Sequence, residues 1–214
     1  TRNVSFGGLA ANVNYAVEIK VTDSDNAAVA TQLYFDTFSP NNLVVEVEDF
    51  NFGGGQFVDN PSVIPEGSGP QPKAYANQAG VQGTDYSDTQ TSLRDVPYRP
   101  DDYVRMRQSF DLTRDKYTKA GGSAASVFDY DVGDILAGEW MNYTRTFPAG
   151  SYEVYLRESL FNGTQVEAVL EKVTSNPAQP NQTTRVLGSF LGQKTGFLLQ
   201  NFPLTDGLGK SKIV

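Results

Sequence analysis

Residues 138–159 read GEWMNYTRTFPAGSYEVYLRES, with apolar and polar residues alternating on both sides of a Pro-Ala-Gly turn. This alternation is typical of a half-buried β-hairpin. Because one register must send alternate side chains of both strands inward, we expect the core side to hold Met141, Tyr143, Phe147, Tyr152, Val154 and Leu156. The same segment holds the chain's one tryptophan, Trp140, directly after Glu139.

Similar short segments recur along the chain, separated by clusters rich in Gly, Pro, Asn and Ser. They predict further strands at Tyr15–Val21, Val29–Phe35, Val44–Phe50, Tyr103–Phe110, Val166–Val173 and Arg185–Leu191. No segment has a convincing helical period over four turns. Short strands between regular turn signals predict an all-β fold, specifically a β-sandwich or jelly roll.

The composition excludes several kinds of site. The 214 residues contain no Cys and no His, which removes thiol nucleophiles, imidazole catalysis and the usual zinc ligands. The 17 Lys and Arg are scattered among 25 acids, for a net charge of −8, so we expect no nucleic-acid partner. No apolar run reaches the ~20 residues that span a bilayer, and we expect no membrane insertion.

Residues 1–40 form a separate segment of two predicted strands around Asp23–Asn26. The stretch GLAANVNYAVEIKVTDSDN resembles the closing strands of a fibronectin-type-III domain, over about 35 residues. Two or three strands cannot bury the apolar face of a sheet unaided. We therefore expect residues 1–40 to be a partial β-sandwich that either docks on the following sandwich or lies against a partner.

From residue 43 to 206 the chain resembles family-six carbohydrate-binding modules. The similarity rests on EVEDFNFGGG, GVQGTDYSD, YRPDDYVRM and DYDVGDILAGEWMNYTRTFPAGSYEVYLR, in that order. The resemblance implies a jelly roll that binds polysaccharide without cleaving it. It defines a second domain over residues 41–214, and the family's last strands would fall beyond Val214, so we expect this domain to be incomplete at its C-terminus.

The resemblance also suggests binding residues. The family's first stacking aromatic falls on Asp134, which is not aromatic, and the second falls near Phe197, which can stack but cannot hydrogen-bond. In this family the hairpin tryptophan is a structural position. The large apolar area of an indole also favours burial, so we expect Trp140 to pack rather than to stack on sugar.

A replacement site is predicted in DYSDTQTSLRDVPYRPDDY, residues 85–103, where Tyr86, Tyr98 and Arg99 lie in turn-rich sequence with several acids. Tyrosine beside Asp and Arg combines ring stacking with bidentate hydrogen bonds to sugar hydroxyls. The alternative is a long ordered loop whose tyrosines pack on the sandwich.

Glu46 and Glu48 are expected on one face of the strand VEVEDF, at i and i+2. In the resembled family, acids of this strand join a late Asp around a structural calcium, and several oxygen ligands suit this ion. That late Asp would lie past Val214. The alternative is an acidic edge strand that discourages pairing with other chains.

Together these patterns predict a non-catalytic polysaccharide-binding module of a larger secreted or cell-surface multidomain protein, and no enzyme. The alternative is a structural or adhesive module without a sugar site, in which neighbouring domains or self-assembly complete the open sheets. A glycosidase would need two carboxylates ~5 to 9 Å apart, and no pair is indicated by spacing.

Overall fold

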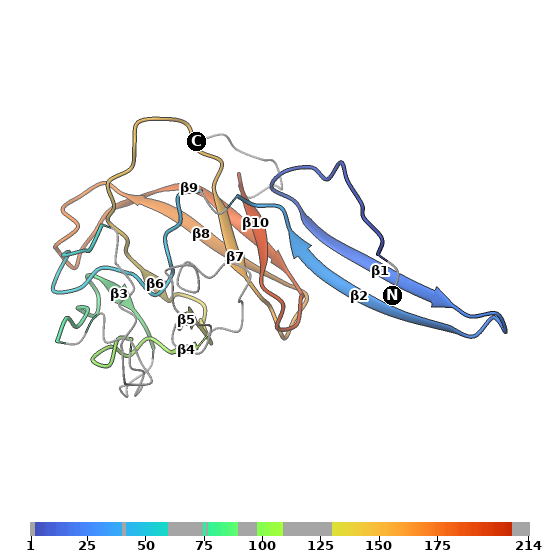
Figure 1. Cartoon of the computed structure of the whole chain (residues 1–214). Coiled ribbons are helices and arrows are strands. Elements are labelled where there is room, and N and C mark those ends of the chain that lie inside the picture. Colours follow the sequence, from blue (N-terminus) through green and yellow to red (C-terminus); the bar gives the residue numbers. More distant parts are fainter. Residues whose placement is uncertain are drawn as a thin grey trace, which may run out of the picture. The chain divides into compact units, whose positions relative to one another are not determined.

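The computed structural model describes residues 3–39, 42–59, 75, 77–89, 98–108 and 130–206. The described residues form strands and turns and no helix, which confirms the predicted all-β class (Figure 1). The strands are β1 (Asn14–Thr22), β2 (Ala28–Asp36), β3 (Tyr86–Ser87), β4 (Met106–Gln108), β5 (Tyr130–Val132), β6 (Trp140–Met141), β7 (Tyr155–Glu158), β8 (Gln165–Val173), β9 (Thr184–Gln193) and β10 (Gln200–Thr205). No segment of bilayer-spanning length and apolarity occurs as a helix in these residues.

The chain divides into two compact units, and each combines distant parts of the sequence. The first unit comprises Thr1–Leu43, Ser151–Leu170 and Leu187–Val214; the second comprises Val44–Gly150 and Glu171–Val186. This division differs from the predicted boundary after residue 40, because residues 1–43 group with two later segments. Jelly-roll topology stays a prediction, since the described strands form one four-stranded sheet and three two-stranded sheets.

In the first unit, β1 and β2 form the predicted antiparallel hairpin, with register Tyr15↔Phe35 to Val21↔Val29. The turn is held by Asp23, whose Oδ1 accepts from the amides of Asp25 and Ala27, both at 2.9 Å. Short polar side chains favour such turns because they cap the backbone locally. Strand propensity and turn chemistry therefore agree, and the prediction is confirmed.

The base of this hairpin is bonded to the strands β7 and β10. The Asn14 side-chain amide donates to the Asn201 carbonyl at 2.8 Å, and Arg157 pairs with Asp36 at 3.1 Å. Phe38 also packs edge-on against Tyr155, with ring centroids 4.8 Å apart. The base of the hairpin therefore docks on a sheet of the same unit.

That sheet has the strand order β7-β10-β9-β8 and confirms the strands predicted at 166–173 and 185–191. Its most buried side chains include Phe190 and Leu204, which lie opposite each other on β9 and β10. Glu158 at the end of β7 reaches over Gly192, where a Cβ would collide with its carboxyl. Burial raises the pKa of Glu158 to about 7.

This buried carboxyl predicts a pH dependence of stability. An unfolded glutamate titrates near ~4.3, so between that pH and about 7 the folded chain keeps a proton that the unfolded chain has released. The free energy of unfolding should therefore fall as pH rises through this window. Glu158→Gln removes this contribution. The free energy of unfolding in urea, taken as wild type minus Glu158→Gln, should therefore be larger at about pH 4.5 than at about pH 8. A difference between the two proteins that does not change with pH would contradict it.

The second unit has an aromatic core. Its buried members are Phe50, Phe52, Tyr75, Tyr86, Tyr98, Val104, Met106 and Tyr130, with Tyr103, Val132 and Met141 packed against them. The rings meet at tilted, edge-on and stacked angles, with centroids 5.0 to 5.8 Å apart. Each aromatic ring buries a large apolar area, so a core can form here from a few residues and with few regular strands.

Two strand predictions in this region are wrong. Val44–Phe50 runs through turns rather than a strand, and residues 138–159 do not form a hairpin. Instead β6 pairs with β3 and β7 pairs with β10. Of the six side chains expected to face a core there, Tyr143 and Phe147 are exposed, while Met141, Tyr152, Val154 and Leu156 are half-buried.

Candidate functional site

Arg99, predicted to bind sugar, lies in the core of the second unit with 1% of its surface exposed. Its Nε donates to Asp102 at 2.6 Å, and its Nη atoms donate to the carbonyls of Glu48, Phe50 and Asn51 at 2.6 to 3.1 Å. The guanidinium also lies over the Phe50 ring, 3.5 Å from its centroid. Every face of the group is occupied by protein, so Arg99 fixes the backbone of residues 48–51.

Tyr86 and Tyr98 are buried as well. The Tyr98 hydroxyl donates to Asp49 Oδ1 at 2.5 Å, and its ring stacks on Tyr130. The Tyr86 hydroxyl accepts from the Tyr103 amide at 3.3 Å, and burial raises its pKa to about 12. The prediction that Tyr86, Tyr98 and Arg99 present a sugar site is therefore wrong, because solvent does not reach them; the alternative of packed tyrosines applies.

Asp134 is exposed in the loop after β5, where its φ is +55°, and its carboxylate pairs with Arg105. The residues on either side, Gly133 and Ile135, line a hollow in the surface of the second unit. Asp134 therefore lies beside this hollow.

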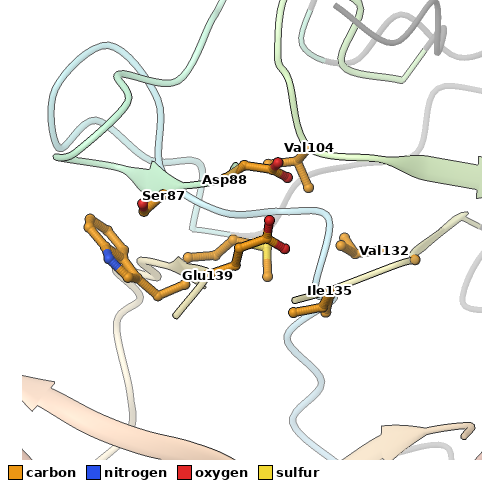
Figure 2. Close-up of a pocket in the computed structure, with 9 residues that line it drawn as sticks. Ser87, Asp88, Val104, Val132, Ile135 and Glu139 are labelled. Carbon is orange, nitrogen blue, oxygen red and sulfur yellow. The ribbon is translucent and has the colours of Figure 1, made fainter. Parts of the chain in front are cut away.

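This surface feature, the Trp140 hollow, lies where β3 pairs with β6 (Figure 2). It is shallow and open to solvent, and its enclosed part, about 10 Å³, has room for about one water molecule. Figure 2 shows Glu139 reaching into its middle, with Asp88 and Ser87 on the β3 side and Ile135 and Val132 opposite. The lining residues are Ser87, Asp88, Val104, Val132, Gly133, Ile135, Glu139, Trp140 and Met141.

Trp140 is 37% exposed, which corrects the expectation that it is buried. Ser87 is its direct cross-strand neighbour. Ile135 and Leu136, nearby in sequence, are also about half exposed. An indole beside aliphatic and acidic side chains offers a flat apolar surface with hydrogen-bonding groups at its rim.

Glu139 holds two segments beside the hollow. Its Oε1 accepts from the amide and hydroxyl of Thr89 at 2.9 and 2.6 Å, and its Oε2 accepts from the Leu136 amide at 2.7 Å. Partial burial raises the pKa of Glu139, but these hydrogen bonds outweigh it and hold the pKa below its usual value. Glu139 is therefore ionised near neutral pH and positions the loop around Trp140.

Phe197, in the first unit, is 72% exposed and stacks on Phe161, which is 53% exposed. The ring centroids are 4.3 Å apart. The Leu160 carbonyl accepts from the amides of Thr195 and Gly196 at 3.2 and 3.0 Å, which holds the two loops together. Phe161 was missed from the sequence, because only this pairing across 36 positions places it beside Phe197.

The acids predicted to bind calcium do not share a strand face. Glu46 is half-buried before a turn, Glu48 is buried in that turn, and the segment is not a strand. In the described ranges no three acidic side chains converge in a way that could hold a metal ion. The predicted donor set is therefore not assembled by these residues, and calcium binding stays a prediction.

The chain matches no protein-family model, no curated protein and no solved structure.

Proposed function

We propose that this chain is a non-catalytic carbohydrate-binding module that holds a polysaccharide against the Trp140 hollow. The observation that carries the proposal is the half-exposed indole of the chain's one tryptophan, set among acidic and aliphatic side chains. The C–H face of a pyranose ring packs on an aromatic face, and its hydroxyls need acceptors and donors at the rim.

The rim supplies both. Asp88 lies on one side of the hollow, and its backbone is fixed by Gln82, whose amide donates to the Asp88 carbonyl at 2.7 Å. The Arg105–Asp134 ion pair lies next to the opposite wall. The hollow is open to solvent and too small to enclose a sugar, so a polysaccharide would lie across it and leave much of each unit exposed.

Binding without cleavage is supported by the state of Glu139. A glycosidase needs one protonated carboxyl as general acid and a second carboxylate across the scissile bond. Glu139 and Asp88 both line the hollow, and the lowered pKa of Glu139 keeps that carboxyl ionised, which does not suit a general acid. We therefore propose capture of polysaccharide by a secreted or cell-surface protein, with a jelly roll as the finer fold.

A second candidate function is that of a structural or adhesive module. It is favoured by the hairpin of β1 and β2, where Val21 and Val29 are 65% and 75% exposed. The two are direct cross-strand neighbours, and contiguous exposed apolar side chains mark a surface that meets another protein.

The test is retention by immobilised polysaccharides, with release of reducing sugar measured in the same samples. Trp140→Ala should lower affinity for a retained glycan roughly tenfold or more, about 1.4 kcal/mol, because the stacking surface is lost. Its melting temperature must be measured beside the affinity, because Trp140 is 37% exposed, so most of its surface is buried and its truncation also costs stability. Adding calcium or EDTA tests the predicted ion in the same assay.

The matched control is Phe197→Ala, an exposed aromatic in the other unit, which should bind as wild type does. Loss of binding in Phe197→Ala with full binding in Trp140→Ala would place the sugar on the Phe161–Phe197 pair and overturn this site. Retention of no glycan, or release of sugar, would contradict the function itself.

A further inference from the structure

The hairpin of β1 and β2 carries one continuous apolar face. Because β1 and β2 pair in register, alternate residues of both strands share that face. The most exposed apolar side chains on it are Val21 at 65% and Val29 at 75%. The face consists of Tyr15, Val17, Ile19, Val21, Val29, Thr31, Leu33 and Phe35.

The outer edge of β1 is open in the part of the chain that the structure describes. β1 is nine residues long and pairs there with β2 alone. A long edge strand with unpaired backbone groups is a template for another strand. An isolated two-stranded hairpin is marginally stable at best in water, and independent stability needs three or more strands with a hydrophobic face.

The opposite face of β1 carries two charges of opposite sign, Glu18 and Lys20. Their cross-strand neighbours in β2 are Gln32 and Ala30, which are uncharged. The hairpin itself therefore gives neither charge an opposite cross-strand neighbour. Opposite charges directly across two strands stabilise a pairing, and like charges destabilise it.

We propose that two copies of this chain pair antiparallel along their β1 edges, with Ile19 opposite Ile19 of the second copy. In this register Glu18 of each copy lies opposite Lys20 of the other, twice by symmetry. Val17 lies opposite Val21, also twice. The result is a four-stranded sheet across the two-fold axis, with one joined apolar face.

Neighbouring registers are disfavoured by the same charges. A slip of one residue would turn every side chain to the other face of the sheet. The register can therefore slip only by two residues at a time. The nearest slips place Glu18 opposite Glu18 or Lys20 opposite Lys20. β1 is therefore self-complementary in one register. This self-association goes beyond the proposed sugar binding, because it uses the first unit of the chain, whereas the Trp140 hollow lies in the second.

The experiment compares single and double charge reversals by sedimentation equilibrium over a concentration series. Glu18→Lys puts two like-charge pairs into the interface and should weaken association roughly tenfold or more. Lys20→Glu should do the same. The double variant Glu18→Lys, Lys20→Glu restores opposite charges and should associate as wild type does.

Folding of each variant is checked by far-UV circular dichroism, and is expected to be unchanged because Gln32 and Ala30 are neutral. A wild-type protein that stays monomeric throughout the series would overturn the proposal. Association that single reversals leave intact, or that the double variant does not restore, would also overturn it.

Discussion

Arg99→Ala is expected to destabilise the second unit by about 3–5 kcal/mol, the cost of breaking a buried ion pair by removing one partner. The change strands Asp102, which is 1% exposed, without its cation. It also frees the carbonyls of Glu48, Phe50 and Asn51, which Arg99 bonds now. Chemical denaturation monitored by circular dichroism should report an early transition or no folded baseline.

The matched control is Arg107→Ala, which breaks an ion pair of nearly equal length, Arg107–Asp131 at 2.7 Å. The side chains of Arg107 and Asp131 are 47% and 22% exposed, so water reaches this pair and its loss should cost clearly less than that of Arg99. Equal effects of the two substitutions would show that Arg99 does not organise the core.

Asp85→Ala is the second large effect that we expect, at about 2–4 kcal/mol. The Asp85 carboxylate is fully buried and accepts from three amides, those of Gly54, Gly55 and Val81, at 2.8, 2.6 and 2.9 Å. Its removal leaves these donors without an acceptor and loosens the loops around the aromatic core. The unfolding midpoint in urea measures the loss.

Asp23→Ala is the control, because Asp23 caps two amides in the same way but in an exposed turn. Water can replace its carboxylate there, so the substitution should shift the midpoint only slightly. An Asp85→Ala protein as stable as Asp23→Ala would contradict the burial argument.

The strands with the clearest alternation could be predicted from sequence. β1, β2, β8 and β9 have nine or ten residues each. β1 pairs with β2, and β8 pairs with β9, so each pair joins strands that follow one another in the sequence. Alternation over that length restricts the pairing to registers two residues apart, which keep apolar residues on one face, and the turn selects one of them. The short strands were harder, because β6 and β7 pair with strands distant in sequence rather than with each other.

The candidate site was mispredicted for a physical reason. A cluster of Tyr, Arg and Asp in turn-rich sequence has the groups of a sugar site, and the same groups build a buried polar network. Composition does not distinguish the two, since burial of Arg99 depends on carbonyls about fifty residues away. Trp140 was mispredicted in the opposite sense, because its exposure depends on how β6 pairs with β3.

The most direct measurement is a fluorescence titration of wild-type protein with a polysaccharide that it retains. Trp140 is the chain's one tryptophan, so its emission reports on the hollow without labels. If sugar covers the indole and displaces water, the emission should shift to the blue and saturate with the affinity measured by retention. Unchanged tryptophan emission at saturating, retained polysaccharide would contradict sugar binding at the Trp140 hollow.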